Sequence, residues 1–156
     1  MNTPDISDHY PNLPYLNGFI SYGQIHRLAG ELQTVYCPDD NSKVKSLLQS
    51  NGTGKVLFID GQASNKVALL GDILATKAIK NNWLGIIVNG CVRDVEILRE
   101  LPLCIFALGA CPKKSSKKDR GEVGIPLKIQ GININNGYWA YGDLNGILIS
   151  KNELSF

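Results

Sequence analysis

Apolar residues gather in three short runs in the middle of the chain. These runs are residues 55–60 (KVLFID), 83–88 (WLGIIV) and 103–108 (LCIFAL). Each is rich in large apolar residues and is bounded by polar residues, glycine or proline, which is typical of a buried strand. The pattern therefore predicts three core strands.

The segments between the runs have the apolar spacing of amphipathic helices. Residues 66–81 show this spacing along one face, and residues 93–100 form a shorter helix that ends before Pro102. We expect a turn at Asn89-Gly90, between the second strand and the second helix. A strand over residues 32–37 and a helix over residues 39–49 extend the alternation toward the N-terminus. Strands that alternate with helices indicate parallel pairing with right-handed crossovers.

Residues 121–156 change to a two-residue alternation, with turn signals at Asn136-Gly137 and Asn145-Gly146. Residues 1–17 are rich in Pro, Asn and Asp, and we expect an irregular N-terminal arm there. Residues 18–156 are then one domain of the α/β class. We predict a layered β/β/α architecture with a parallel βαβαβ middle and a β-rich C-terminal part.

Composition agrees with a folded domain. The chain has 156 residues, of which 44% are hydrophobic and 19% charged, and this balance excludes a disordered chain. No uncharged apolar run approaches the ~18 residues of a membrane-spanning helix. The N-terminus lacks the basic-then-apolar layout of a secretion signal, so we expect a cytoplasmic protein with no membrane partner.

The net charge of +2 is unevenly distributed. Residues 113–120 (KKSSKKDR) hold five basic side chains and one acidic side chain. A nucleic-acid-binding domain usually spreads basic charge over a face, so we interpret this single segment as a solvated turn and expect no direct nucleic-acid partner.

The cysteines do not suggest a metal site. Cys37, Cys91, Cys104 and Cys111 have no CxxC spacing, and neither histidine is near them in sequence. Cys91 has no evident basic partner that would activate it as a nucleophile. We interpret it as a packing residue.

The pair Arg93-Asp94 is the sharpest candidate for chemistry, because it follows a predicted strand and begins a helix. Sites in open α/β sheets gather at the carboxyl ends of strands. A guanidinium can bind a carboxylate through two parallel hydrogen bonds, and the adjacent carboxylate can hold a hard cation such as Mg²⁺. The alternative is an ordinary helix start, where the helix dipole favours an acidic residue.

A second candidate is Gly71-Asp72. Glycine inside a helix costs about 1 kcal/mol relative to alanine. Its presence between apolar residues indicates a helix that begins here, whose free N–H groups could bind an anion, or a close approach of the backbone. A tolerated small residue at a helix–sheet contact is the equally weighted alternative.

Together these residues form a pattern: Asp72, twenty intervening residues, then Arg93-Asp94. The flanking segments are LLGDILATKAIKNNWLGIIVNGCVRDVEIL, LPLCIFALGACP, RGEVGIPL and YGDLNGILIS. Over residues 18–150 the chain resembles the RraA-like family. That family contains regulators of ribonuclease E activity and class II 4-hydroxy-4-methyl-2-oxoglutarate aldolases, and many members were labelled demethylmenaquinone methyltransferases.

The resemblance implies a role for each matching residue. The segment Gly71, Asp72, Ile73 and Leu74 would contact the pyruvyl part of a 2-oxo acid substrate, and Arg93 would bind it. Asp94 would be the ligand of a divalent cation, Mg²⁺ or Mn²⁺, and Asp72 would orient a water at that cation. Asp72 and Arg93 would then be the catalytic residues. The family fold is a swivelling-type β/β/α domain, and members form homotrimers with active sites at subunit boundaries.

The implied activity is retro-aldol cleavage of 4-hydroxy-4-methyl-2-oxoglutarate to pyruvate, with oxaloacetate decarboxylation through the same pyruvate enolate. The alternative is a non-catalytic trimer that binds and inhibits a ribonuclease E-type partner. Longer aldolases lend a C-terminal glutamate to the neighbouring subunit. This chain ends at Phe156, which favours the regulator and leaves Glu122 and Glu153 as candidate substitutes.

Overall fold

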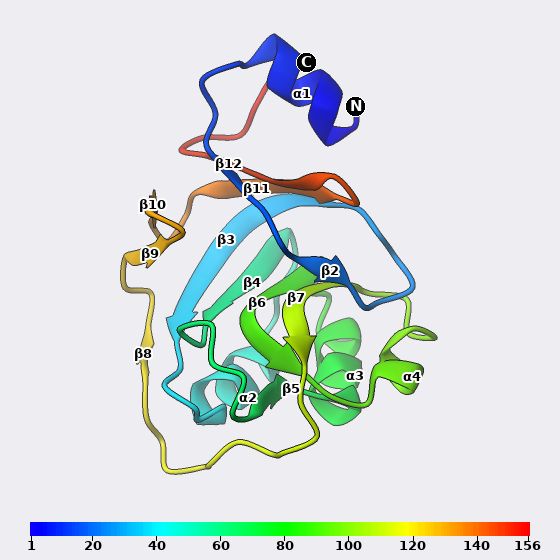
Figure 1. The fold of residues 1–156 in the computed structure, drawn as a ribbon, viewed down its shortest axis with the longest axis vertical. Coiled ribbons are helices and arrows are strands. Elements are labelled where there is room, and N and C mark those ends of the chain that lie inside the picture. Colours follow the sequence, from blue (N-terminus) through cyan, green and yellow to red (C-terminus); the bar gives the residue numbers. More distant parts are fainter.

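One large mixed sheet organises the computed structural model, which describes residues 1–156 (Figure 1). Its four central strands pair in parallel and are, in spatial order, β3 (Leu28–Tyr36), β4 (Lys55–Asp60), β6 (Gly85–Val92) and β7 (Cys104–Ala110). Three helices lie on the connections between them: α2 (Ser42–Leu48), α3 (Asp72–Lys80) and α4 (Val95–Leu98). The predicted parallel middle is therefore confirmed.

Short antiparallel strands extend the sheet on both sides of this centre. Beyond β3 lie β11 (Trp139–Asp143), β12 (Gly146–Ser150) and β1 (Tyr15–Leu16), and beyond β7 lies β2 (Ile20–Ser21). Two further strands pair off this path, β5 (Ala68–Leu70) with β6 and β8 (Glu122–Val123) with β3. A separate hairpin consists of β9 (Leu127–Ile129) and β10 (Ile132–Ile134). The C-terminal part is β-rich, as predicted.

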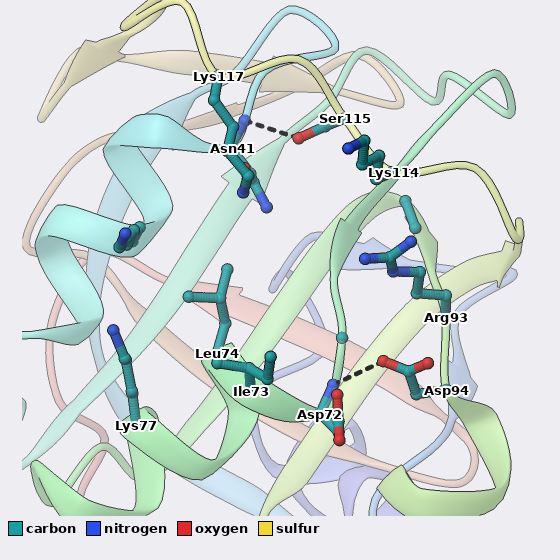
Figure 2. Close-up of a pocket in the computed structure, with 13 residues that line it drawn as sticks. Asn41, Asp72, Ile73, Leu74, Lys77, Arg93, Asp94, Lys114, Ser115 and Lys117 are labelled. Carbon is teal, nitrogen blue, oxygen red and sulfur yellow. Dashed lines mark hydrogen bonds between the residues drawn. The ribbon is translucent and has the colours of Figure 1, made fainter.

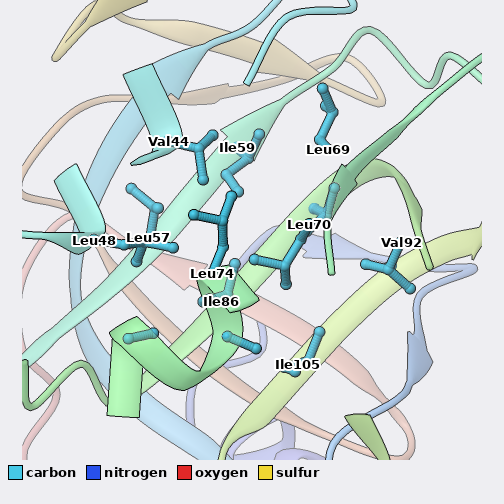
Figure 3. Close-up of a cluster of buried hydrophobic side chains, with 14 of the residues drawn as sticks. Val44, Leu48, Leu57, Ile59, Leu69, Leu70, Leu74, Ile86, Val92 and Ile105 are labelled. Carbon is cyan, nitrogen blue, oxygen red and sulfur yellow. The ribbon is translucent and has the colours of Figure 1, made fainter. Parts of the chain in front are cut away.

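The sheet separates two hydrophobic cores. Along β4 the side chains alternate, so that Leu57 and Ile59 pack with the helices while Val56 and Phe58 pack on the opposite side. Figure 3 shows the helical core, in which Leu74 of α3 lies among strand residues. Burial of each large side chain contributes about 1.5–3 kcal/mol. The two cores give the predicted β/β/α layers.

The first seventeen residues differ from the irregular arm that we expected. They contain helix α1 (Thr3–His9), whose N-cap Asn2 accepts a hydrogen bond from the Asp5 N–H at 3.0 Å. The Asp143 carboxylate accepts two more hydrogen bonds, from the Thr3 N–H and hydroxyl at 2.7 Å each. An N-cap asparagine followed by a proline in the first turn was the overlooked signal.

Two other elements differ from the sequence prediction. Residues 66–81 are not one helix, because β5 occupies their first part and α3 begins only at Asp72. Asn89-Gly90 does not form a turn, because β6 continues through it to Val92 with a register shift. The Asn89 side chain donates to Asp60 Oδ1 at 3.0 Å. Pairing with neighbouring strands overrides the local turn preference here.

No helix of the structure has the length and apolarity needed to cross a membrane.

Candidate active site

The two sequence candidates lie next to each other because β5 and β6 end together. Leu70 pairs with Val92 in parallel register, and the Arg93 N–H donates to the Leu70 carbonyl at 3.0 Å. Each chain segment leaves the sheet at this point and continues into a helix, α3 or α4. The twenty-residue spacing between Asp72 and Arg93 is thus the path through α3 and β6.

Asp94 turns its side chain back toward the start of α3. Its backbone is left-handed, with φ 59° and ψ 40°, a conformation that aspartate tolerates better than most residues. Asp94 Oδ2 accepts a hydrogen bond from the Asp72 N–H at 3.1 Å. A Cβ at position 71 would lie 2.6 Å from the same oxygen. Gly71 is therefore both the N-cap of α3 and the site of a close approach.

The Arg93 guanidinium keeps most of its donors free. It is half-buried, and Nη1 donates to the Pro112 carbonyl at a long 3.5 Å. The one ion pair of the structure joins Lys43 to Asp119 at 2.8 Å, so Arg93 is paired with neither Asp72 nor Asp94. Its guanidinium can therefore bind a carboxylate ligand through two hydrogen bonds.

These residues open onto one cavity of about 250 Å³ (Figure 2). All six residues singled out from the sequence line it: Gly71, Asp72, Ile73, Leu74, Arg93 and Asp94. The first N–H groups of a helix have no partner within that helix, and the start of α3 faces this space. The cavity therefore offers backbone donors, a guanidinium and two carboxylates within one small volume.

The sequence interpretation missed one wall of the cavity. Lys114, Ser115 and Lys117 belong to the segment interpreted as a solvated turn, yet all three line the cavity. Asn41, the N-cap of α2, Lys45 of α2 and Lys77 of α3 also line the cavity. Lys117 meets Asn41, which lies 76 residues earlier in the chain at the start of α2. No local sequence pattern links two segments that are so far apart.

Asp40 holds this basic segment in place. Its buried carboxylate accepts hydrogen bonds from the Lys118 N–H at 2.5 Å, from the Ser116 hydroxyl at 3.3 Å and from the Ser42 N–H at 2.9 Å. Burial alone would raise the pKa of Asp40. The hydrogen bonds together outweigh burial and lower the pKa to about 2. Asp40 is thus ionised at neutral pH.

The donors at the site fit a hydrated divalent cation. The structure contains no cluster of three or more His, Cys, Asp or Glu side chains that could enclose a metal. Mg²⁺ is commonly held by one or two carboxylates and several waters, and Asp94, with Asp72 beside it, supplies that set. Cys91 is buried, and burial raises the pKa of its thiol, which agrees with a packing role.

The two candidate glutamates are not at this site. Glu122 and Glu153 are both exposed, and neither lines the cavity. The only carboxylates that line the cavity are those of Asp72 and Asp94.

Comparison with known proteins shows which family the chain belongs to. The model of the family described as "RraA-like: Aldolase/RraA" matches residues 3–149. The chain belongs to the RraA-like family. A relative from Acinetobacter baylyi, named "Putative 4-hydroxy-4-methyl-2-oxoglutarate aldolase", is 48% identical over 143 residues, which are 90% of this chain and 84% of the relative.

Solved structures of this RraA-like fold match almost completely. The RNA-processing inhibitor RraA from Thermus thermophilis has a TM-score of 0.96 at 42% identity, covering 99% of this chain and 95% of that one. A structure from Geobacillus kaustophilus, named as an S-adenosylmethionine: 2-dimethylmenaquinone methyltransferase, has a TM-score of 0.95 at 34% identity, covering 99% and 97%. The predicted fold class is confirmed, and the names of the sequence relatives support an aldolase.

Proposed function

We propose that this protein is a divalent-metal-dependent lyase that cleaves 4-hydroxy-4-methyl-2-oxoglutarate to pyruvate by a retro-aldol reaction and also decarboxylates oxaloacetate. One observation carries the proposal. Arg93, which forms no ion pair, lies beside Asp72 and Asp94 at the carboxyl ends of two parallel strands, and all three residues line one cavity. The names of the relatives support the aldolase part of this proposal.

In this mechanism Arg93 binds the C1 carboxylate and the 2-oxo group of the substrate. Free N–H groups at the start of α3 fix the same end of the molecule. A divalent cation held by Asp94 would supply Lewis-acid stabilisation of negative charge on the 2-oxo oxygen. Arg93 contributes to the same stabilisation, because its charge faces the oxygen where negative charge develops.

Bond cleavage then leaves the electron pair on the pyruvyl fragment. In the aldol substrate the C3–C4 bond breaks, the C4 hydroxyl gives its proton to solvent water, and C4 becomes the carbonyl carbon of a second pyruvate. In oxaloacetate the departing group is CO2. Both reactions leave pyruvate enolate, and a water held by Asp72 protonates its C3 carbon. Oxaloacetate has no C4 hydroxyl group, so its decarboxylation needs no base to remove a hydroxyl proton. It therefore tests the site most directly.

The test is pyruvate release from each substrate, with Mg²⁺ and with EDTA. We expect metal-dependent turnover that falls by at least about 100-fold in Arg93→Ala and in Asp94→Ala, since each removes a charged group at the reacting end. Arg99→Ala, an exposed arginine at the end of α4, is the matched control and should retain activity. Turnover no higher than that of Mg²⁺ alone, from folded protein, would refute the lyase.

The second candidate function that we propose is a homotrimeric regulator that binds a ribonuclease E-type protein. The observation in its favour is the TM-score of 0.96 to a protein named RNA-processing inhibitor RraA. Sedimentation would measure the assembly, and titration with a ribonuclease E-type protein would measure binding. Tight binding that Arg93→Ala leaves unchanged, without pyruvate release by the wild type, would favour this function over the lyase.

A further inference from the structure

The basic segment, residues 113–118 (KKSSKK), is anchored to the protein along its length. Figure 1 shows the chain leaving β7 and passing below β5 and α2 before it reaches β8. Two isolated bridges join the segment to β5 and to the residues before α2. Ser115 is only 5% exposed, and the Ser116 hydroxyl donates to Asp40 Oδ2 at 3.3 Å. The serines therefore hold the segment, and its four lysines are exposed.

No carboxylate neutralises these four lysines, since the one ion pair of the structure involves none of them. Lys117 donates to a neutral group, Asn41 Oδ1, at 3.3 Å, and Asp40 accepts the backbone N–H of Lys118. Four ammonium groups within six residues repel one another, and a free loop would let them separate. The anchoring instead keeps them together as a pre-organised cationic row, which lowers the entropic cost of binding an anion.

Cationic side chains from two helices extend this row. Lys45 of α2 and Lys77 of α3 line the same cavity as Lys114 and Lys117 (Figure 2). Residues 113–120 hold five basic side chains and one acidic side chain, whereas the whole chain has a net charge of only +2. The rest of the molecule is therefore negative on balance. The positive charge is concentrated on one face, which is the electrostatic signature of a surface that binds a polyanion.

The composition and shape of this face select the class of polyanion. Lysine is depleted in protein–protein interfaces, which are enriched in aromatic residues, and residues 112–120 contain no aromatic or large apolar residue. A flat membrane surface would not reach lysines that surround the mouth of a cavity. A DNA duplex is stiff over about 150 base pairs, whereas a single strand can bend around such a mouth and place successive phosphates against the lysines.

We propose that residues 113–118, with Lys45 of α2 and Lys77 of α3, bind the phosphate backbone of single-stranded nucleic acid. No aromatic side chain lines the cavity on which a base could stack, so the binding has no sequence preference. The sequence favoured a solvated turn and no nucleic-acid partner, because one basic segment by itself is weak evidence. The structure adds the anchoring and the helical lysines. The inference does not depend on the proposed lyase activity.

The test is fluorescence anisotropy of a labelled oligothymidylate of about 12 nucleotides, which is longer than the roughly 20 Å that six extended residues span. We expect a Kd of about 1–100 μM at physiological salt, the range of sequence-independent binding. The logarithm of the association constant should fall with the logarithm of salt concentration with a slope of about −3, as for four phosphate contacts. No binding below about 1 mM protein, or a slope shallower than about −1, would overturn the proposal.

A pair of double variants separates this face from a general effect of charge. Lys113→Ala/Lys118→Ala removes two lysines of the row that do not line the cavity. We expect the affinity for the oligonucleotide to fall about 10-fold or more at low salt and the slope to become shallower by about 1.4. Pyruvate release from oxaloacetate should not change. Lys128→Ala/Lys151→Ala removes the same charge from exposed positions on β9 and after β12, and the affinity should change by less than about 2-fold. Equal losses in the two double variants would overturn the proposal.

Two other polyanions test the class of partner. Polyglutamate at equal charge should displace the oligonucleotide at least about 10-fold less effectively, because its charges sit on flexible side chains whose ordering costs entropy. Vesicles of phosphatidylserine and phosphatidylcholine should not sediment with the protein at physiological salt. Equal displacement by polyglutamate, or vesicle binding that Lys113→Ala/Lys118→Ala abolishes, would assign the face to an acidic protein or a membrane and overturn the proposal. Pyruvate release is measured separately, so the lyase stands or falls independently.

Discussion

The two sides of the cavity are held together by different kinds of interaction. On the side of Arg93 and Asp94, the parallel pairing of β5 with β6 sets the geometry through backbone hydrogen bonds. On the side of Lys114 and Lys117, one buried carboxylate, Asp40, anchors a segment outside the sheet through side-chain contacts. A substitution of one side chain cannot remove the first arrangement, but it can remove the second.

This contrast predicts different consequences of mutation. Changes on the strand side should alter chemistry with little effect on folding. Changes at Asp40 should alter the order of the basic segment that lines the cavity. Four substitutions or conditions test the contrast, in descending order of expected effect.

Gly71→Ala, on the strand side, should give the largest effect of these four. The new methyl group would displace the Asp94 carboxylate, which ends a side chain that can rotate away. We expect kcat/KM for oxaloacetate to fall about 10–100-fold and the Mg²⁺ requirement to rise, since 1.4 kcal/mol of lost stabilisation is a factor of ten. The free energy of unfolding should change by less than about 1 kcal/mol.

Gly90→Ala is the control for this substitution. It lies near the end of β6, and an added Cβ would meet its nearest neighbour, Leu69 Cδ1, at an ordinary 3.6 Å. Activity should therefore be retained. Equal activity of the two alanine variants would show that the position of Asp94 does not limit turnover.

Asp40→Ala should give the next largest effect, on the basic side. It leaves the N–H groups of Lys118 and Ser42 without their acceptor, which costs about 1–3 kcal/mol of unfolding free energy. Pyruvate release from oxaloacetate should fall by no more than about 10-fold, because Arg93 and Asp94 keep their positions while the basic segment that lines the cavity loses its anchor. A loss as large as that of Arg93→Ala would contradict the separation of the two sides.

Lowering the pH should reproduce part of the loss of stability expected for Asp40→Ala. The folded-state pKa of about 2 is below the usual aspartate value, so folding favours the ionised form. The stabilisation is complete above about pH 5 and declines as pH falls from about 4 toward 2. Urea unfolding of wild type and Asp40→Ala should show a constant difference between pH 5 and 7 that narrows in acid. A difference that grows in acid would contradict this sign.

Asp119→Ala should give the smallest effect. Asp119 is exposed and pairs with Lys43 at the surface, an interaction worth less than about 1 kcal/mol. Pyruvate release from oxaloacetate should change by less than about 2-fold. A change as large as that of Asp40→Ala would show that charge in this segment matters more than its anchoring.

The sequence by itself determined the alternation of strands and helices and the β-rich C-terminal part, because these features depend on local periodicity. It singled out Asp72, Arg93 and Asp94 through their positions near the ends of predicted strands and through the resemblance of their spacing to a known family. The segment 55–60 forms β4 with the predicted bounds, and Asp72, Arg93 and Asp94 meet as the pattern suggested.

Only the tertiary structure decided three other features. Asn89-Gly90 became part of β6 because neighbouring strands paired with it, and residues 66–81 divided at Gly71 because β5 joined the sheet. The basic segment reached the cavity because Asp40, distant in sequence, accepts its hydrogen bonds. The spacing of apolar residues along a segment indicates which face of the helix or strand is buried. It carries no information about which distant segment completes the hydrogen bonds of a buried polar side chain.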